Sequence, residues 1–330
     1  MLNSKVKLSR KIFGKDVEMI PTRDGYGDGL VMAGEKNDDV VVLTADLADS
    51  TRAQAFAEKF PERFFECGVA EQAMATVAAG LGTSGKIPFI SSYATFSPGR
   101  NWEQIRTSIS YNDSNVKIAG HHSGISVGPD GVTHQAVEDI ATMRVMANMT
   151  VIQPCDAIEA RKATIQAAKV WGPMYLRFSR EKTAVLTSDT SPFTIGRAEV
   201  LWEEKGAKVL IIGCGPLLHH ALLAAKELKK EKVPVVVLNS HTIKPLDAKT
   251  ILPLAKKIGA VLTVEEHQVH GGLGGAVAEL LARECPVPIE FIGMQDTFAE
   301  SGPPDELWNK YGMGVEDIKR AVNKVLKRKR

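Results

Sequence analysis

The sequence predicts an α/β protein built from two doubly wound domains with mostly parallel sheets. Its 330 residues exceed one ordinary hydrophobic core, so about two domains are expected. Short β-branched runs alternate with amphipathic segments of helix length, a pattern typical of parallel strands covered by helices on both faces. A polar, aperiodic segment interrupts the alternation once. We therefore expect a first domain over 1–186, a linker over 187–192 and a second domain over 193–330.

The first domain is expected to contain strands at its short apolar runs. These are VVVLT (40–44), KIPFIS (86–91), NVKIAG (115–120), TVIQP (150–154) and MYLRFS (174–179). Another strand is expected at RFFEC, followed by a helix with Glu71 in its first turn, where the helix dipole favours an acid by up to about 1 kcal/mol. Gly27-Asp28-Gly29 lies within a helical pattern after the expected cap Thr22.

The second domain repeats the alternation with KVLIIG, VPVVVLN, AVLTVEE, PIEFIG and two closing helices. Gly213 and Gly215 precede a helix but lack the third glycine and the ribose-binding acid of a dinucleotide site, so a tight turn is favoured. The run HGGLGGAVAEL is expected to serve close packing rather than anion binding. The basic tail KVLKRKR is expected to be a solvated, frayed helix end.

Composition narrows the classes of partner. Lys and Arg number 41 against 39 Asp and Glu, a formal net charge of +2, so nucleic acid is not expected as a partner. The four cysteines form no CxxC pair, which favours a reducing, cytoplasmic setting. No stretch approaches the roughly 18 apolar residues of a membrane span. The two His-His pairs lack a third ligand at metal spacing, so no protein-only metal site is expected.

A glycine-rich loop carries the strongest functional signal. HHSGISVGPDGVTHQAVEDI brings His122, Asp130 and His134 together between two strands. Packing explains such a loop poorly, because loops more often carry function than core. Shortly before it, Tyr93, Phe96 and Trp102 form an aromatic cluster at a strand-to-helix junction, for which core packing is the alternative explanation.

Over about residues 20 to 182 the chain resembles the transketolase family of thiamine diphosphate enzymes. The matching motifs are GVAEQ, the aromatic TF step, GPDGVTHQAVED followed by MTVIQPCD, and residues of TRDGYG, TADLADS and RFSRE. The remaining third agrees in pattern and in VLTVEEH and GGLGGAV. The resemblance implies a pyrimidine-binding domain over 1–186 and a transketolase C-terminal domain over 193–330.

Family members also carry a diphosphate-binding domain, and this chain resembles the other two domains alone. The magnesium motif of that domain is GDG followed at a distance by an Asn pair, and no such pair follows Gly27-Asp28-Gly29. The resemblance implies that thiamine diphosphate and Mg²⁺ are held mainly by an N-terminal partner subunit, in an α2β2 heterotetramer. The chain would then be active only with that partner.

The resemblance assigns four residues to the cofactor. Glu71 matches the glutamate that hydrogen-bonds the aminopyrimidine ring nitrogen, and Phe96 matches the aromatic residue that stacks on the pyrimidine. Trp102 is expected to close the pocket. Asp46 matches a residue near the cofactor at the dimer interface.

The resemblance assigns a second group of residues to the substrate. Asp130 and His134 match residues that hydrogen-bond the hydroxyls and carbonyl of the donor, and with Glu71 they are the expected catalytic residues. The residues matched to the substrate phosphate are Arg23, Ser50, His122 and Arg180. Two guanidiniums, a hydroxyl and an imidazole suit a phosphate dianion.

The implied function is that of the C-terminal subunit of a split transketolase. Such an enzyme transfers a two-carbon ketol unit reversibly from a phosphoketose to an aldose phosphate, as in the pentose phosphate pathway. One alternative is the β subunit of a 2-oxo acid dehydrogenase, whose substrates bear no phosphate. A second is a deoxyxylulose-phosphate synthase-like subunit, which the SREK step disfavours. A non-enzymatic alternative is a dimerisation or regulatory partner, whose signature would be the loss of Glu71.

Overall fold

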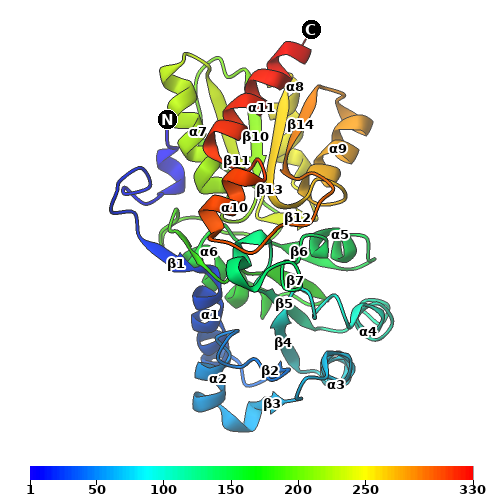
Figure 1. Ribbon diagram of the computed structural model, residues 1–330. Coiled ribbons are helices and arrows are strands. Elements are labelled where there is room, and N and C mark those ends of the chain that lie inside the picture. Colours follow the sequence, from blue (N-terminus) through cyan, green and yellow to red (C-terminus); the bar gives the residue numbers. More distant parts are fainter. Residues whose placement is uncertain (330) are drawn as a thin grey trace.

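Two α/β units are stacked one above the other in the computed structural model, which describes residues 1–329 (Figure 1). The lower unit is built around a seven-stranded sheet and the upper unit around a five-stranded sheet. Both ends of the described chain lie beside the upper unit. The predicted α/β class is therefore confirmed.

The seven-stranded sheet is parallel except at one edge. Its strands, in spatial order, are β3 (Phe64–Glu66), β2 (Val40–Thr44), β4 (Ile87–Tyr93), β5 (Lys117–His121), β7 (Met174–Arg177), β6 (Thr150–Ile152) and β12 (Thr242–Lys244). All the strands predicted for the first half are present. The edge strand β12 comes from the second half of the chain and pairs antiparallel to β6, which the sequence pattern did not predict.

Helices cover both faces of this sheet. Alternate residues of β2 show why: Val41 and Leu43 belong to one apolar cluster, whereas Val40 and Val42 belong to another on the opposite face. The first face carries α3 (Glu71–Thr83), α4 (Trp102–Gln104), a π-helical turn at Ile105–Ser110 and α5 (Asp139–Arg144). The second face carries α1 (Thr22–Lys36), α2 (Gln54–Lys59) and α6 (Ala157–Ala167). Burial on two faces explains the uninterrupted apolar runs of these strands.

Helix α1 contains the Gly27-Asp28-Gly29 tripeptide, as the sequence predicted. Its glycines serve helix packing, because a Cβ atom on Gly25 would lie 1.9 Å from the Ala157 carbonyl oxygen of α6. The expected cap is wrong by one residue. Pro21 is the N-cap, and the Thr22 hydroxyl instead accepts a hydrogen bond of 2.6 Å from the Ser179 backbone.

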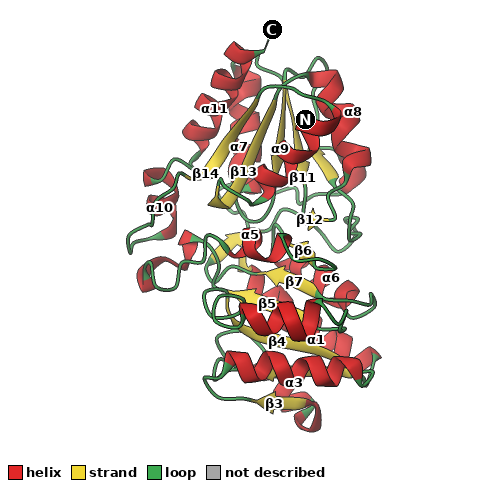
Figure 2. Ribbon diagram, turned by 90° about the vertical axis from the view of Figure 1, so that its right-hand side faces the viewer, coloured by secondary structure: helices red, strands yellow, loops and turns green. Residues whose placement is uncertain are grey.

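The five-stranded sheet forms the core of the second unit. Its strands, in spatial order, are β14 (Ile289–Met294), β13 (Val261–Gln268), β10 (Val209–Gly213), β11 (Val235–Asn239) and the antiparallel β9 (Glu199–Trp202). Its helices are α7 (Leu218–Lys230), α8 (Ala248–Ile258), α9 (Leu273–Glu284), α10 (Pro304–Lys310) and α11 (Val315–Arg328). Helices α8 and α11 lie on opposite faces of this sheet (Figure 2). A separate two-stranded sheet pairs β1 (Met19–Pro21) with β8 (Lys182–Ala184).

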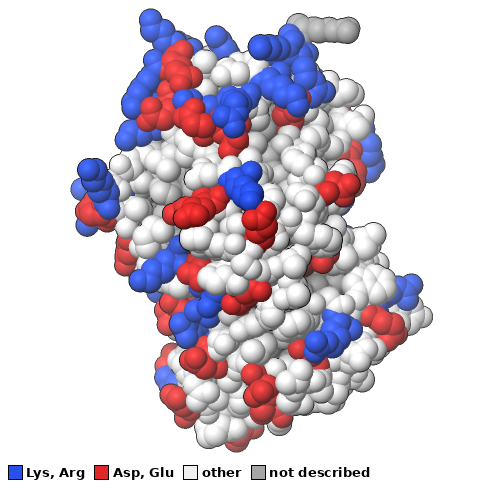
Figure 3. Space-filling view, in the orientation of Figure 1, with Lys and Arg blue, Asp and Glu red and all other residues white. Residues whose placement is uncertain are grey.

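The basic C-terminal tail is helical and packed rather than frayed as far as Lys329, and Arg330 lies outside the described residues. Helix α11 extends to Arg328, whose guanidinium donates a hydrogen bond of 2.7 Å to the Ile289 carbonyl, and Lys329 bonds the Ile258 carbonyl at 2.5 Å. Figure 3 shows Lys and Arg side chains gathered at this end of the molecule. The tail therefore packs along the edge of the second sheet.

The glycine-rich entry to α9 binds an anion supplied by the chain itself. The backbone N–H groups of Leu273 and Gly274 donate to the Glu265 carboxylate at 2.7 and 2.6 Å. Burial raises the pKa of Glu265, and the two N–H groups offset part of this rise, so that the pKa is about 7. The expectation of close packing alone was therefore incomplete, because the exposed N–H groups of a helix start favour a carboxylate.

Other segments also cross between the units. The N-terminal segment packs on the second unit, where the Asn3 N–H donates to the Leu201 carbonyl at 2.9 Å and Ile12 is buried. The start of the linker is held by the first unit instead. The carboxylate of Asp156 accepts hydrogen bonds from the Leu186 and Thr187 N–H groups at 2.7 and 2.5 Å. The two units are thus interlocked along the chain.

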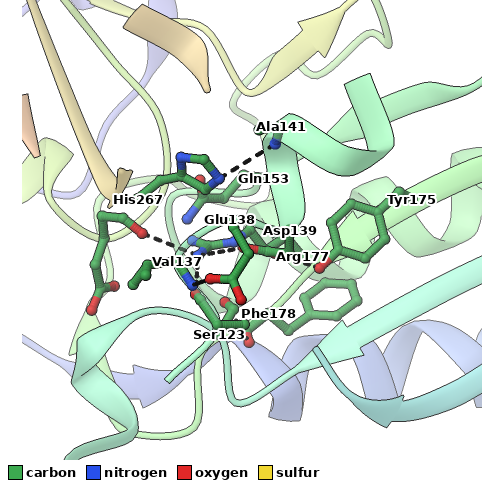
Figure 4. Close-up of polar contacts among 12 residues, drawn as sticks. Ser123, Val137, Glu138, Asp139, Ala141, Gln153, Tyr175, Arg177, Phe178 and His267 are labelled. Carbon is green, nitrogen blue, oxygen red and sulfur yellow. Dashed lines mark hydrogen bonds and ion pairs between the residues drawn. The ribbon is translucent and has the colours of Figure 1, made fainter. Parts of the chain in front are cut away.

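A buried ion pair joins the units at their centre (Figure 4). Arg177, at the end of β7 and 1% exposed, donates to the Asp139 carboxylate at 2.7 and 3.1 Å, and Tyr175 donates to the same carboxylate at 2.5 Å. Burial opposes the charge on Asp139, but the Arg177 guanidinium holds its pKa below the usual range. The guanidinium also donates to the Glu266 carbonyl of β13 at 3.0 Å. First-unit helix α5 and second-unit strand β13 are thereby held to one side chain.

We predict that Arg177→Met lowers the free energy of unfolding by about 3–5 kcal/mol, because it leaves the Asp139 carboxylate buried and unpaired. Urea denaturation of the two proteins at pH 7 measures this difference. The matched control is Arg320→Met, which removes a guanidinium that is 72% exposed and paired with Asp317. We expect it to cost less than about 1 kcal/mol. Equal, small losses for both variants would contradict the structural role of the buried pair.

Candidate active site

The residues expected to be functional gather at the carboxyl edge of the parallel sheet. Five of them follow a strand of that sheet directly or after a short loop, at the edge where α/β proteins bind ligands. Ser50 follows β2, Glu71 follows β3, Phe96 follows β4, His122 follows β5 and Arg180 follows β7. Strand order therefore places residues from distant parts of the sequence side by side.

Glu71 is the first residue of α3 and is 1% exposed. Its carboxylate accepts hydrogen bonds from the Arg100 guanidinium at 2.5 Å and from the Ser92 hydroxyl at 3.3 Å. The Arg100 side chain remains 45% exposed. Glu71 is thus a buried carboxylate with a charged partner on its solvent side, a stronger arrangement than the helix dipole alone provides.

Aromatic rings connect Glu71 with the glycine-rich loop. The Arg100 guanidinium lies over Phe96, 4.8 Å from the ring centroid. Phe96 stacks with Tyr93 at 5.9 Å and meets the edge of His134 at 5.5 Å. Tyr93 in turn stacks on His122 at 3.9 Å. Phe96 and His134, predicted from different motifs, are therefore in contact.

His122 and Arg23 form the other end of this row. An Arg23 N–H donates to Nε2 of His122 at 2.9 Å and to the Ser50 carbonyl at 2.8 Å. Ser50 therefore contacts Arg23 through its backbone. Because a guanidinium only donates, Nε2 is the acceptor and a neutral ring carries its proton on Nδ1. Within residues 1–329, neither His122 Nδ1 nor Arg23 Nε has a hydrogen-bond partner, although both are buried.

The charges around His122 keep it neutral. Burial lowers its pKa to about 3, and the nearby Arg23 and Arg180 guanidiniums act in the same direction. Arg180 lies 3.5 Å from the carboxylate of Asp130 and 3.4 Å from that of Glu181, each pair partly exposed. Asp130 and Arg180, predicted for donor and phosphate, thus contact each other.

Trp102 and Asp46 also lie outside this row, as do Asp130 and Arg180. Trp102 donates its indole N–H to the Thr142 carbonyl at 3.3 Å and lines a cavity with Thr95 and Gly99. Asp46 is exposed, has a φ of 60°, and is held through its N–H by the Glu66 carboxylate at 2.7 Å. Within the described chain, neither side chain forms a hydrogen bond or an aromatic pair with Phe96 or Glu71.

The sequence interpretation missed Arg100 and Ser92, and assigned no role to Tyr93. Tyr93 and Ser92 end β4, next to the recognised TF step, so their place in the chain was a usable signal. Arg100 gives no such signal, because nothing in its sequence context distinguishes it from a surface arginine.

Comparison with known proteins identifies the family. Residues 18–185 match the transketolase pyrimidine binding domain, and residues 196–318 match the transketolase C-terminal domain. The chain therefore belongs to the transketolase family, whose members depend on thiamine diphosphate. Within the family it is a split transketolase-like protein. It is 42% identical over 309 residues to a transketolase C-terminal section of Methanocaldococcus jannaschii, with 93% of this chain and 96% of that protein covered.

Further matches agree with the assignment to the transketolase family. A 6-deoxy-6-sulfo-D-fructose transketolase subunit of a Clostridium species is 40% identical over 307 residues, with 93% of this chain and 95% of that protein covered. A solved split gene transketolase, an inactive β4 tetramer, gives a TM-score of 0.88 at 46% identity and covers 94% of this chain and 100% of that chain. By contrast, the chain spans about half, 49%, of full-length human transketolase. These matches favour transketolase over the dehydrogenase and deoxyxylulose-phosphate synthase alternatives.

The described residues offer neither a cluster of metal ligands nor a helix suited to a membrane. No group of three or more His, Cys, Asp or Glu side chains within residues 1–329 could hold a metal ion. In the same part of the chain, no helix is both long and apolar enough to cross a membrane.

We predict that His122 does not titrate between pH 5 and 8, because burial and two neighbouring guanidiniums place its pKa at about 3. Its Cε1–H resonance, followed by NMR, tests this. In Arg23→Met the loss of the nearest positive charge should raise the pKa, whereas the distant Arg320→Met should leave it unchanged. Below about pH 6.5 the unfolded chain binds a proton that the folded chain does not, so this group lowers stability by about 1.4 kcal/mol per pH unit down to about pH 3. A wild-type midpoint near 6.5 would contradict the buried, neutral state.

Proposed function

We propose that this chain is the C-terminal subunit of a two-chain transketolase. It would transfer a two-carbon ketol unit reversibly between sugar phosphates in the cytoplasm, as in the pentose phosphate pathway. Thiamine diphosphate and Mg²⁺ would be held mainly by an N-terminal partner in an α2β2 assembly. One observation carries the proposal: a continuous row of side chains links the buried Glu71 carboxylate to the Arg23 and His122 pair.

The cofactor end of the row fits an aminopyrimidine. Glu71 offers a buried carboxylate that accepts hydrogen bonds, and Phe96 offers a half-buried aromatic face beside it. Thiamine diphosphate, when bound, supplies the nucleophile and the electron sink for breaking the carbon–carbon bond. Glu71 would hold the ring nitrogen and set its protonation, and Phe96 would fix the plane of the ring by stacking. Trp102 and Asp46 are proposed to border the cofactor from positions outside the row.

The substrate end fits an anionic sugar. His134 lies against Phe96 and Tyr93, so it can reach the donor carbonyl and hydroxyls close to the pyrimidine. Asp130 is proposed to accept from a donor hydroxyl. Farther along, Nδ1–H of His122 and Nε–H of Arg23 are buried donors without partners in the described chain, as a site for a phosphate requires. Arg180 and Ser50 would complete that phosphate site.

One second candidate concerns the anion itself. The 40% identical relative named above is a subunit of a 6-deoxy-6-sulfo-D-fructose transketolase. A sulfonate has the same three-oxygen geometry as a phosphate but carries one charge fewer, so the same guanidiniums could bind it. The donor experiment below therefore includes a sulfonated sugar.

Reconstitution tests the need for a partner. We expect the chain alone to bind thiamine diphosphate weakly and to show no ketol transfer, and both properties to appear with an N-terminal subunit bearing the diphosphate–magnesium motif. Titration calorimetry and a coupled transfer assay measure them, and light scattering reports the α2β2 mass. In the control complex, Glu71→Ala should assemble but react at least about 10²-fold more slowly. Sub-micromolar cofactor binding by the homogeneous chain alone would overturn the proposal, and an inert complex would favour the regulatory alternative.

The proposed phosphate site predicts that its variants lose activity selectively toward a phosphorylated donor. Charge-assisted hydrogen bonds are worth roughly 1.5–3 kcal/mol, so Arg180→Ala or Arg23→Ala in the complex should lower kcat/KM about 10- to 100-fold for a phosphorylated donor. The loss should appear first in KM, because the phosphate is remote from the breaking bond.

Hydroxypyruvate, a donor without a phosphate, is the control substrate. With it, kcat/KM of the two variants should fall little. Equal losses for both donors would make these arginines structural. A sulfonated donor preferred by the wild-type complex would replace the phosphate assignment by the sulfonate one.

A further inference from the structure

The Arg100 guanidinium occupies the position where the pyrimidine of the cofactor is expected. It donates to the Glu71 carboxylate at 2.5 Å and lies over the Phe96 ring at 4.8 Å. Those are the two contacts that the proposed function assigns to the aminopyrimidine, one with the carboxylate and one with the aromatic face. An aminopyrimidine that bonds Oε2 of Glu71 and lies over the same face of Phe96 would therefore meet the guanidinium.

A guanidinium is well suited to this position. It is planar, delocalised and rich in N–H donors, so it can stack on an aromatic face while it donates to a carboxylate in its own plane. An aminopyrimidine offers the same combination of a flat π-system and N–H donors. The site therefore favours the same chemistry from either source.

We propose, on the basis of the proposed function, that the Arg100 guanidinium is a placeholder: it occupies the site of the aminopyrimidine until thiamine diphosphate binds and displaces it. While the site lacks cofactor, Arg100 neutralises the buried Glu71 and covers Phe96. When the cofactor enters, its pyrimidine takes over both contacts and the guanidinium moves into solvent. Binding is weakened by the strength of the contacts that Arg100 gives up.

The surrounding structure limits this movement to the side chain. Asn101, which is fully buried, donates to the Glu71 carbonyl and to the Ser97 hydroxyl, each at 3.1 Å. A Cβ atom on Gly99 would lie 1.9 Å from the Thr95 carbonyl, so the turn before Arg100 is tightly packed. The Arg100 side chain, in contrast, is 45% exposed, so part of it already faces solvent.

The test compares cofactor affinity in the reconstituted complex. Arg100→Met removes the guanidinium and should lower the Kd for thiamine diphosphate about two- to fivefold, the range expected for a partly exposed ion pair. Arg100→Lys keeps the charge and supports folding but loses the planar stack. Its Kd for thiamine diphosphate should therefore lie between those of the wild type and Arg100→Met. The matched control is Arg106→Met, an exposed arginine of the following helical turn, which should leave Kd unchanged.

A second readout follows Arg100 itself. The Nε–H resonance of Arg100 in the chain alone should shift in Glu71→Gln and in Phe96→Leu, and cofactor added to the complex should move it toward the Glu71→Gln position. Unchanged or weaker cofactor binding by Arg100→Met, in a complex that binds normally otherwise, overturns the placeholder alone. A wild-type complex that binds no thiamine diphosphate overturns the proposed function and the placeholder with it.

Discussion

The buried pair of Arg177 and Asp139 is the contact on which the arrangement of the site depends. Forming an ion pair away from water gains little net free energy, although removing one partner afterwards is costly, so the main contribution of the intact pair is geometric. Two donors on one guanidinium fix the start of α5 against β7 and reach the backbone of Glu266 in β13. The Glu266 carboxylate then accepts from the N–H of Ser126 at 2.6 Å, inside the glycine-rich loop. The second unit thereby holds the loop that carries Asp130.

Sequence patterns predicted the elements whose structure depends on residues close together in the chain. Val40–Thr44 is a strand buried along its whole length, and its unbroken apolar run indicated that. The loop with His122 and His134 was recognisable because its glycines exclude a helix or a central strand. Contacts across long stretches of chain were not predictable in this way. Strand β12 joins the sheet of the other unit, and Arg100 reaches Glu71 from beyond α3 and β4, although neither β12 nor Arg100 has a distinguishing local pattern.

The two ends of the site have opposite electrostatics. At one end the carboxylate of Glu71 is buried and paired. At the other, Arg23 forms no salt bridge with a carboxylate of the described chain, and the neighbouring His122 is uncharged. A neutral imidazole avoids adding a third positive charge beside two guanidiniums, yet it keeps one N–H donor. The proposed anion-binding end can therefore stay folded without an anion, and the contact between Asp130 and Arg180 is long and partly exposed, so it can open.

Strand β12 has a consequence for how such a protein could be divided. It covers the outer edge of β6, so the seven-stranded sheet is complete only when the second half of the chain is present. A gene cut in the linker after Thr187 would yield a first fragment with a bare, apolar strand edge at Val151 and Ile152. Bare edges of this kind pair with other chains and promote aggregation. Selection against such an aggregation-prone fragment would keep these two domains on one polypeptide. The diphosphate-binding domain of a full-length enzyme is not subject to this constraint.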